Sequence, residues 1–172
     1  MRVVKVGGSL FDLPDLSTRL QNWLAANNDL QNILLAGGGK FVDAIRDAQL
    51  IHRFDDQTAH RLSIETMSTT AILLSSMLPG AFETVDIDAA LASESDTIVF
   101  RPAIWLRGET RLQQSWEVTS DTIAAHLAVS IDAEELVLMK SVDFDESNDT
   151  FTDTCFEKTA QRLSCRFVNL RL

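Results

Sequence analysis

The sequence lacks several features that would point to particular classes of protein. It has two cysteines, Cys155 and Cys165, and neither stands in a C-x-x-C or other metal-like spacing, so we expect reduced thiols in a cytosolic protein. No apolar run approaches the roughly 18 residues of a membrane-spanning helix. Lys5 and two glycines interrupt the apolar run at the N-terminus, which is unlike a signal peptide. These absences predict a cytoplasmic protein that does not bind a membrane.

Basic residues are also scarce. The chain has 15 Lys and Arg against 25 Asp and Glu, which gives a formal net charge of −10. The basic surface that nucleic-acid backbones require is therefore not expected. Backbone N–H groups and one or two lysines can still hold a small anion locally. The expected partner is a small anionic substrate, not a nucleic acid.

The common nucleotide-binding and catalytic motifs are missing as well. The run GGGKF at 37–41 lacks the first glycine and the Ser or Thr of a Walker loop, and Val42 stands where G-x-G-x-x-G needs its last glycine. There is no H-E-x-x-H and no G-x-S-x-G. The scattered His52, His60 and His126 are interpreted as surface or capping residues, so no metal site is predicted.

What the sequence does contain is an alternation of short apolar strands with helices. Strands are predicted at 2–6, 32–36, 82–87, 96–100, 135–140 and 165–170. Helices are predicted at 12–28, 40–50, 55–78, 119–131 and 154–164, with a short one between the third and fourth strands. Near-continuous apolar strands alternating with helices predict one α/β domain over residues 1–172, with a parallel sheet covered on both faces.

The remaining segments give less definite expectations. In the long helix 55–78, the candidates for burial are Leu62, Met67, Ile72 and Leu73. Residues 101–118 are irregular, and Trp105 and Trp116 fit either a packing role or a substrate pocket. The acidic stretch 143–153 favours a solvated loop over a metal site. Thr119 or Ser120 is expected to cap the helix that follows.

Two glycine runs each follow a predicted strand. Gly7 and Gly8 end the first strand, and Gly37–Gly39 end the second. In an open α/β sheet, ligands bind at the carboxyl ends of the strands, where glycine turns let backbone N–H groups face a phosphate. The alternative is two tight turns that need positive φ angles. Two runs on successive strands favour an anion site.

Four segments in this order resemble the amino acid kinase superfamily, which is aspartate, glutamate and uridylate kinase-like. They are KVGGSL (5–10), LLAGGGKF (34–41), TSDTIAAHLA (119–128) and LVLMKSVDFD (136–145). FDDQTAHRLSIETM (54–67) resembles the branch that phosphorylates a furanmethyl phosphate in methanofuran synthesis, a one-carbon cofactor route. The resemblance implies a three-layer αβα sandwich with a mainly parallel sheet. It also implies transfer of the γ-phosphoryl group of ATP, with Mg²⁺, to a phosphate, carboxylate or carbamate oxygen.

The resemblance also implies a role for each matching residue. The matches to catalytic positions are Lys5, Gly8, Asp121 and Lys140. The matches to loops that bind the acceptor or the transferring group are Gly7, Ser9, Gly37, Gly38 and Gly39. The matches on the nucleotide side are Lys140, Ser141 and Asp143. In the family, the first lysine contacts the transferring group and the aspartate orients the lysines. Without that role, Asp121 is a helix-cap residue and Lys140 a solvated strand end.

The nucleotide side departs from the family pattern. Residues 1–118 match the acceptor-binding part, whereas 119–172 form a shortened nucleotide-binding part with no glycine after Gly108. Glu146 stands where the family loop has glycine, and Lys158 is the candidate substitute for a missing lysine. Two functions follow from this mixture. One is an ATP-dependent kinase, and the other is a degenerate kinase-fold protein that binds an anionic metabolite or acts as a non-catalytic subunit. The apolar content of helix 55–78 also predicts a homodimer.

Overall fold

The computed structural model describes residues 1–109, 111–144 and 151–172. Within them, one sheet has the strand order β3-β4-β2-β1-β5-β6, and each recorded pairing is parallel. The strands are β1 (Arg2–Val6), β2 (Asn32–Ala36), β3 (Phe82–Thr84), β4 (Thr97–Phe100), β5 (Glu135–Lys140) and β6 (Cys165–Asn169). The helices are η1 (Gly8–Asp12), α1 (Leu16–Ala26), α2 (Lys40–His52), α3 (Asp56–Ser76), α4 (Ile87–Ala92), α5 (Ser120–Ser130) and α6 (Phe156–Ala160).

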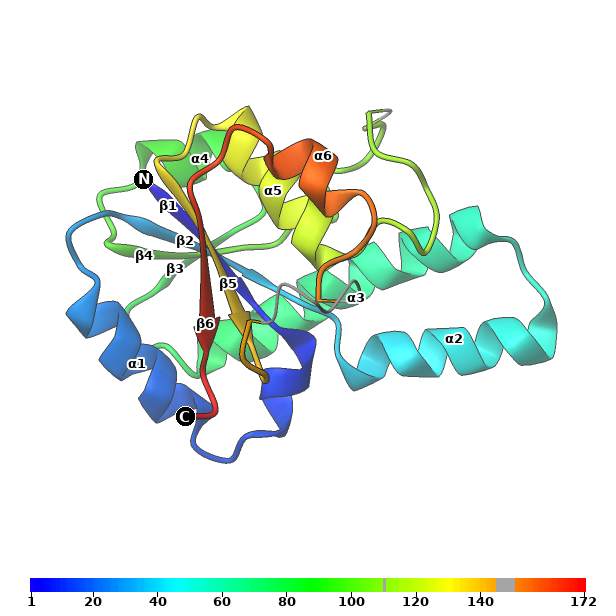
Figure 1. The fold of residues 1–172 in the computed structure, drawn as a ribbon, viewed down its shortest axis with the longest axis horizontal. Coiled ribbons are helices and arrows are strands. Elements are labelled where there is room, and N and C mark those ends of the chain that lie inside the picture. Colours follow the sequence, from blue (N-terminus) through cyan, green and yellow to red (C-terminus); the bar gives the residue numbers. More distant parts are fainter. Residues whose placement is uncertain (110, 145–150) are drawn as a thin grey trace.

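The predicted architecture is confirmed. Helices α4, α5 and α6 cover one face of the sheet, and α1 with part of α3 covers the other, which makes three layers (Figure 1). Each predicted strand is present, although the one expected at 82–87 ends at Thr84. The helix expected at 154–164 is shorter than predicted and forms only at Phe156–Ala160. None of the helices in the described ranges is long and apolar enough to cross a membrane.

Alternation along the buried strands supplies both layers of the core. In β1, Val3 packs toward α5, whereas Val4 and Val6 pack toward α1. Successive side chains of a strand point to opposite faces, so a fully apolar strand fits only between two helical layers. Lys5 shares the face of Val3 and is buried as well, with 5% of its surface exposed. A lysine is thus directed under α5.

The predicted burial of the long helix is wrong at three of four positions. Met67 is buried, but Leu62, Ile72 and Leu73 are 39–46% exposed. The inward positions of α3 are Met67, Ala71 and Leu74, which recur at helical spacing on its other side. Helix α2 has no fully buried residue and extends with the start of α3 away from the sheet (Figure 1).

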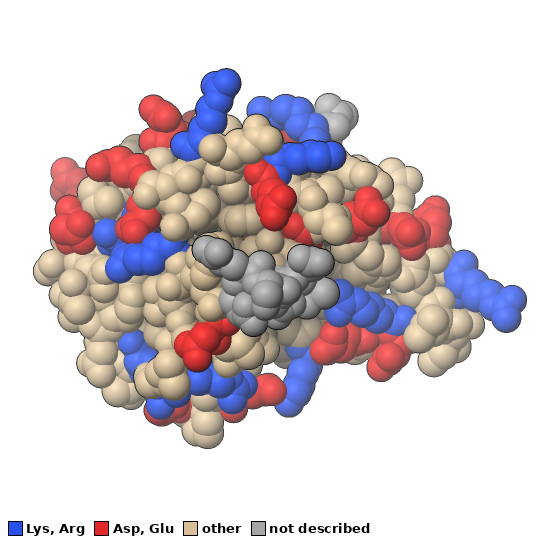
Figure 2. Space-filling view, viewed as in Figure 1, with Lys and Arg blue, Asp and Glu red and all other residues tan. Residues whose placement is uncertain are grey.

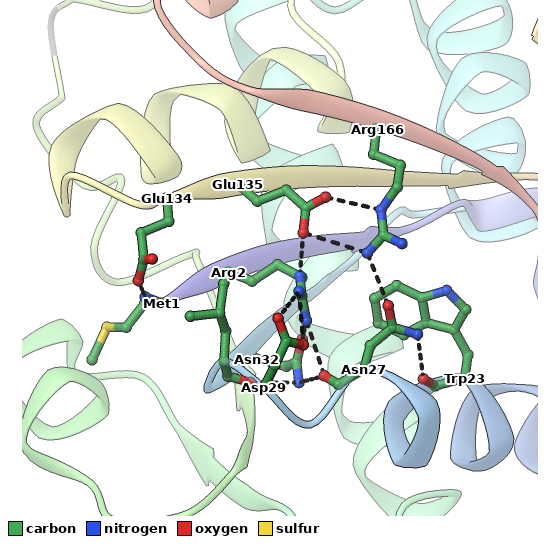
Figure 3. Close-up of polar contacts among 10 residues, drawn as sticks. Met1, Arg2, Trp23, Asn27, Asp29, Asn32, Glu134, Glu135 and Arg166 are labelled. Atoms are coloured by element: carbon green, nitrogen blue, oxygen red, sulfur yellow. Dashed lines mark hydrogen bonds and ion pairs between the residues drawn. The ribbon is translucent and has the colours of Figure 1, made fainter.

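A network of polar contacts centred on Arg2 lies at the amino-terminal ends of the strands (Figure 3). The glycine loops lie at the opposite, carboxyl-terminal ends. Arg2 is 4% exposed and donates to the carboxylates of Glu135 and Asp29 and to the carbonyl oxygen of Asn27. Arg166 of β6 pairs with the same Glu135 at 2.9 Å. Because Glu135 begins β5, this network ties the first residues of β1, β5 and β6 together. A buried arginine is tolerated here because acceptors surround it.

Candidate active site

The two glycine loops touch each other through their backbones at the carboxyl ends of β1 and β2. A Cβ atom added to Gly8 would lie 2.5 Å from the Cα atom of Gly39, and one added to Gly39 would lie 2.5 Å from the carbonyl oxygen of Gly8. Gly39 also has a φ of 55°, which favours glycine. The glycine runs therefore have a structural cause. The two parallel strands end side by side, and their loops can approach this closely only where the residues have no side chain.

The same contact leaves backbone donors free. Four N–H groups of the loops have no hydrogen-bond acceptor in the described part of the chain: those of Gly8, Ser9, Gly38 and Gly39. Gly7 and Gly37 differ, because their N–H groups donate to the carbonyl oxygens of Met139 and Val6. Unpaired N–H groups beside the start of a helix form an environment suited to an anion.

A cavity of about 380 Å³ opens beside these donors. Gly8, Ser9, Gly38 and Gly39 line one part of it. The apolar part is lined by Val42, Ile64, Met67, Trp116, Val118 and Ile123, and polar side chains of Asp12, Lys40, Asp43, Arg46, His60 and Ser63 also reach it. Its size and mixed lining suit a small molecule with an anionic end and an apolar body.

Two lysines share one buried carboxylate next to the cavity. Lys5 Nζ lies 2.8 Å from Asp121 Oδ1, and Lys140 Nζ lies 2.5 Å from Asp121 Oδ2. Asp121 is 4% exposed and Lys5 is 5% exposed. Lys140 also donates to the carbonyl oxygen of Phe151. Two ammonium groups around one carboxylate leave a positive charge that Asp121 does not balance.

This triad shifts the titration of its members. Burial alone would raise the pKa of Asp121, but the charges of Lys5 and Lys140 outweigh burial and hold that pKa below its usual range. Burial and the nearby charge of Lys5 lower the pKa of Lys140, although Asp121 opposes the shift. Asp121 is thus an anion at neutral pH, and one lysine is poised to lose its proton more easily than a solvated one.

A second carboxylate fixes the helix that carries Asp121. Thr119 is the N-cap of α5, as expected, and its side chain accepts from the N–H of Asp121. The Asp153 carboxylate accepts from the N–H groups of Thr119 and Thr122 and from both their hydroxyls. An anion at the positive end of a helix is stabilised by the helix dipole. The first turn of α5 is therefore held in place under the glycine loops.

The irregular segment 101–118 forms a wall of the cavity and is anchored to α5. His126 Nε2 lies 2.9 Å from the Glu109 carboxylate, and its ring packs against Trp105. The Arg111 side chain and backbone N–H, with His126, hold the pKa of Glu109 well below its usual range. Trp105 is thus a packing anchor. Trp116 lines the cavity, with the Arg46 guanidinium 4.6 Å from its ring centre.

The residues that the structure describes do not suggest a resident metal. Among them, no group of three or more His, Cys, Asp or Glu side chains is placed to hold an ion.

A comparison with known families decides what this arrangement is. The pattern of the amino acid kinase family matches residues 1–156. This chain belongs to the amino acid kinase family. It is accordingly a phosphotransferase, a small-molecule kinase.

Similar proteins agree with this membership. The chain is 26% identical, over 146 residues, to the [5-(aminomethyl)furan-3-yl]methyl phosphate kinase of Methanocaldococcus jannaschii, a match that covers 83% of this chain and 67% of that protein. The fold resembles the uridylate kinase of Archaeoglobus fulgidus, with a TM-score of 0.72, 18% identity and coverage of 98% and 90%. It also resembles the UMP kinase of Bacillus anthracis, with a TM-score of 0.72, 12% identity and coverage of 99% and 87%.

The amino acid kinase fold brings most of the predicted site residues together. Lys5, Asp121 and Lys140 form the triad, and Ser9 Oγ lies 2.9 Å from Ser141 Oγ, which links the loop after β1 to the residue after β5. Asp143 accepts from the Asn169 side chain 3.0 Å away. Lys158 is exposed on α6. Glu146 lies outside the described residues, as does most of the acidic stretch.

The triad itself does not line the cavity. Of the predicted residues, Gly8, Ser9, Gly38 and Gly39 line it. The N–H groups of Gly7 and Gly37 serve backbone pairing and are not free for an anion. The triad lies beside the cavity, next to Thr119 and Ser120, which do line it. Phe151 covers it on the side of Lys140.

Sequence reasoning misplaced two histidines. His60 and His126 were expected at the surface or in caps, but each is only 6% exposed. His60 lines the cavity together with Ile64 and Met67, which follow it at i+4 and i+7 on α3. That spacing was the signal that could have placed His60 at the inner side of the helix, because residues at i, i+4 and i+7 share one side of a helix.

Proposed function

We propose that this protein transfers the γ-phosphoryl group of ATP to the phosphate of a small acceptor and so forms a diphosphate. The observation that carries the proposal is the set of four free backbone N–H groups at one cavity, adjacent to two buried lysines that share one carboxylate. The acceptor phosphate would lie against Gly38 and Gly39, and the transferring group between Gly8 and the lysines.

The acceptor we propose is an (aminomethyl)furanmethyl phosphate or a close analogue. Support comes from the named kinase of Methanocaldococcus jannaschii and from the apolar part of the cavity, which suits a small ring. Residues 1–118 would then bind the acceptor, and residues 119–172 the nucleotide. This assignment would place the protein in the synthesis of a methanofuran-type one-carbon cofactor.

The proposed reaction needs no covalent bond between the protein and its substrates. An acceptor phosphate oxygen attacks the γ-phosphorus, a new P–O bond forms, and the bond to the ADP oxygen breaks. The attacking oxygen is already anionic, so no base is needed. The chain's part is to align the groups and to neutralise charge, with the N–H of Gly8 and the ammonium groups of Lys5 and Lys140 facing the oxygens.

Lys140 needs one rearrangement in this scheme. Its ammonium donates to the Phe151 carbonyl oxygen, and a phosphate oxygen would replace that carbonyl. Mg²⁺ bound with the nucleotide would neutralise further charge on the phosphates. Ser141 and Asp143, next to Lys140, would lie along the nucleotide.

The test is transfer itself. We expect ADP release from Mg²⁺–ATP that depends on the furanmethyl phosphate, and a loss of at least about a hundredfold in kcat for Lys5→Ala. The exposed Arg162→Ala is the matched loss of a positive charge and should match the wild type. Binding of the phosphate without any ATP turnover would instead support the degenerate kinase-fold alternative.

We also propose that the protein is a homodimer. Leu62 and Leu73 are eleven residues apart on α3, which puts them on one side of the helix, and Ile72 lies next to Leu73. All three are 39–46% exposed, which is unusual for large apolar side chains on one helix. A second copy of α3 presents the same apolar side, as a two-fold interface requires.

A further inference from the structure

One buried histidine at the cavity has only one of its ring nitrogens paired. His60 Nδ1 lies 3.2 Å from the carbonyl oxygen of Ser115, and a carbonyl can only accept, so Nδ1 carries the hydrogen. No hydrogen bond is recorded for Nε2 among the described residues. Nε2 is not one of the fully buried atoms that lack a hydrogen-bond partner. Part of its surface is therefore accessible. His60 is 94% covered and lines two cavities: the one beside the glycine loops, and a second one of about 370 Å³ that α3 forms with Ala103, Leu106 and Gln114.

The charge state of this ring follows from its surroundings. Burial lowers the pKa of His60 by penalising the imidazolium, although the Ser115 carbonyl opposes this shift. The ring is therefore neutral at pH 7, and Nε2 presents a lone pair. A neutral imidazole nitrogen at the wall of a cavity can accept a hydrogen bond from a ligand.

His60 lies at a definite distance from the anion-binding loops. Thr66 of α3 is the residue near Gly38, within 4 Å of the point where a side chain on that glycine would begin. His60 precedes Thr66 by six residues, which is about 9 Å along an α-helix. Ile64, between these two residues, and Met67, directly after Thr66, give the cavity an apolar wall. That separation suits a small ring with a phosphate on one side and a donor group on the other.

We propose that His60 determines which acceptor the enzyme takes: its Nε2 accepts a hydrogen bond from an amine or hydroxyl on the far end of the phosphorylated ring. This inference rests on the proposed function, because it takes the anionic end of the acceptor to lie at Gly38 and Gly39. It adds a residue that reads the opposite end. A compound of the same shape without the donor leaves Nε2 unpaired and binds more weakly.

The experiment compares two phosphates in the full chain. One is [5-(aminomethyl)furan-3-yl]methyl phosphate, and the other is furan-3-ylmethyl phosphate, which lacks the donor. A third, with a hydroxymethyl group in place of the aminomethyl group, separates amine from hydroxyl. Calorimetry gives Kd, and ADP release gives kcat and KM. We expect the wild type to bind a donor-bearing compound about tenfold more tightly than the bare ring.

Two variants of His60 divide the roles of its nitrogens. His60→Asn keeps an N–H near the Nδ1 position for Ser115 and removes the acceptor at Nε2. It should reduce the tenfold preference to about one, because the Kd for the donor-bearing compounds rises more than the Kd for the bare ring. His60→Gln places a carboxamide near the Nε2 position and should retain most of the preference. A merely structural His60 would change the Kd of both compounds equally.

The possible failures are distinguishable. If ATP turnover depends on the phosphates but the wild type binds all three equally, His60 has no part in selection and the proposed function stands. A preference that persists in His60→Asn overturns the inference in the same way. If none of the phosphates binds or is phosphorylated, both the proposed function and the role of His60 are wrong. The wild-type comparison does not depend on the variants folding.

Discussion

At the scale of single residues, the site depends on a carboxylate that two lysines share. Lys5 would be costly in the middle of a buried strand, and its partner is not predictable from β1 alone. Asp121 supplies that partner from α5, 116 positions later in the chain. A buried lysine without a nearby carboxylate would lose its proton, so Asp121 keeps the charge in place.

Removing the charge of Asp121 should damage both stability and activity. In Asp121→Asn, two ammonium groups face each other without a carboxylate, so we expect a loss of about 3 kcal/mol or more in the free energy of unfolding. Urea denaturation measures it. The control is Asp15→Asn, which breaks the exposed Asp15–Arg19 pair and should cost at most about 0.5 kcal/mol. Equal costs in the two variants would contradict the shared role of Asp121.

The lowered pKa of Lys140 predicts an alkaline limb in the rate profile. As pH rises through this pKa, Lys140 loses its proton and the positive charge that faces the transferring group. Transfer should therefore slow at a pH below the usual lysine range near about 10.4. Lys140→Arg keeps its charge at every accessible pH, so its limb should shift upward even if its maximal rate is lower. A limb that does not move would assign the titration to another group.

At the scale of elements, the ends of neighbouring strands and helices build the site. The loops after β1 and β2 meet because these strands pair in parallel register, with Val6 opposite Ala36. Helix α5 crosses beneath them and presents Asp121 from its first turn. Lys140 comes from the end of β5, on the other side of β1. The glycine loops, the start of α5 and the end of β5 meet next to β1. There the sheet changes direction, because β2, β4 and β3 follow on one side of β1, and β5 and β6 on the other.

The glycine contact should not tolerate a methyl group. In Gly8→Ala, the new Cβ overlaps backbone atoms of Gly39 that cannot rotate away, so we expect a loss of about 3 kcal/mol in the free energy of unfolding. Gly80→Ala is the matched control, since its Cβ meets nothing within 4 Å and only the positive φ of 87° is strained. That change should cost about 1 kcal/mol. Thermal denaturation of both variants would show whether the contact or the φ angle matters.

The carboxylate at the start of α5 should matter more than an ordinary cap. Asp153→Ala leaves three N–H groups, including that of Cys155, and two hydroxyls without their acceptor, and we expect a cost of about 2 kcal/mol. Asp86→Ala removes an exposed cap that accepts from two N–H groups of α4 and should cost about 1 kcal/mol. Chemical denaturation compares the two. A smaller loss for Asp153 would mean that water replaces its carboxylate.

At the scale of the whole molecule, the body and its extension have different surfaces. The three-layer body buries its central strands β1 and β2 completely, whereas α2 and the start of α3 reach away from it (Figure 1). On the face shown in Figure 2, Lys and Arg side chains are separated by Asp, Glu and uncharged residues. Despite the net charge of −10, Lys5 and Lys140 supply positive charge locally beside the cavity.

The exposed apolar side of α3 predicts self-association. A glutamate at position 73, in Leu73→Glu, would place a charge in the proposed α3–α3 interface, so we expect a dimer in the wild type and a monomer in the variant. Sedimentation velocity measures both. Ala25→Glu changes an exposed position of α1 in the same way and should leave the dimer intact. A wild-type monomer at micromolar concentration would remove the proposal.

The sequence by itself determined the order of elements, the parallel sheet and the positions of the glycine loops. Apolar strands of five or six residues that alternate with helices bury their surface in few arrangements other than a parallel sheet between two helical layers. Glycine follows the first two of these strands directly. The same local signals predicted a cap at Thr119 or Ser120, and Thr119 is the cap. The family resemblance pointed to Lys5, Asp121 and Lys140, whose meeting the fold then displayed.

Only the tertiary structure decided which side of each element faces inward and what meets there. Leu62 and Leu73 are as apolar as Leu74, but the side of α3 that packs against the sheet carries Leu74 and not the other two. His60 lines a cavity whose other walls come from distant segments. Local periodicity does not determine which side packs inward, because that depends on contacts between elements far apart in the chain.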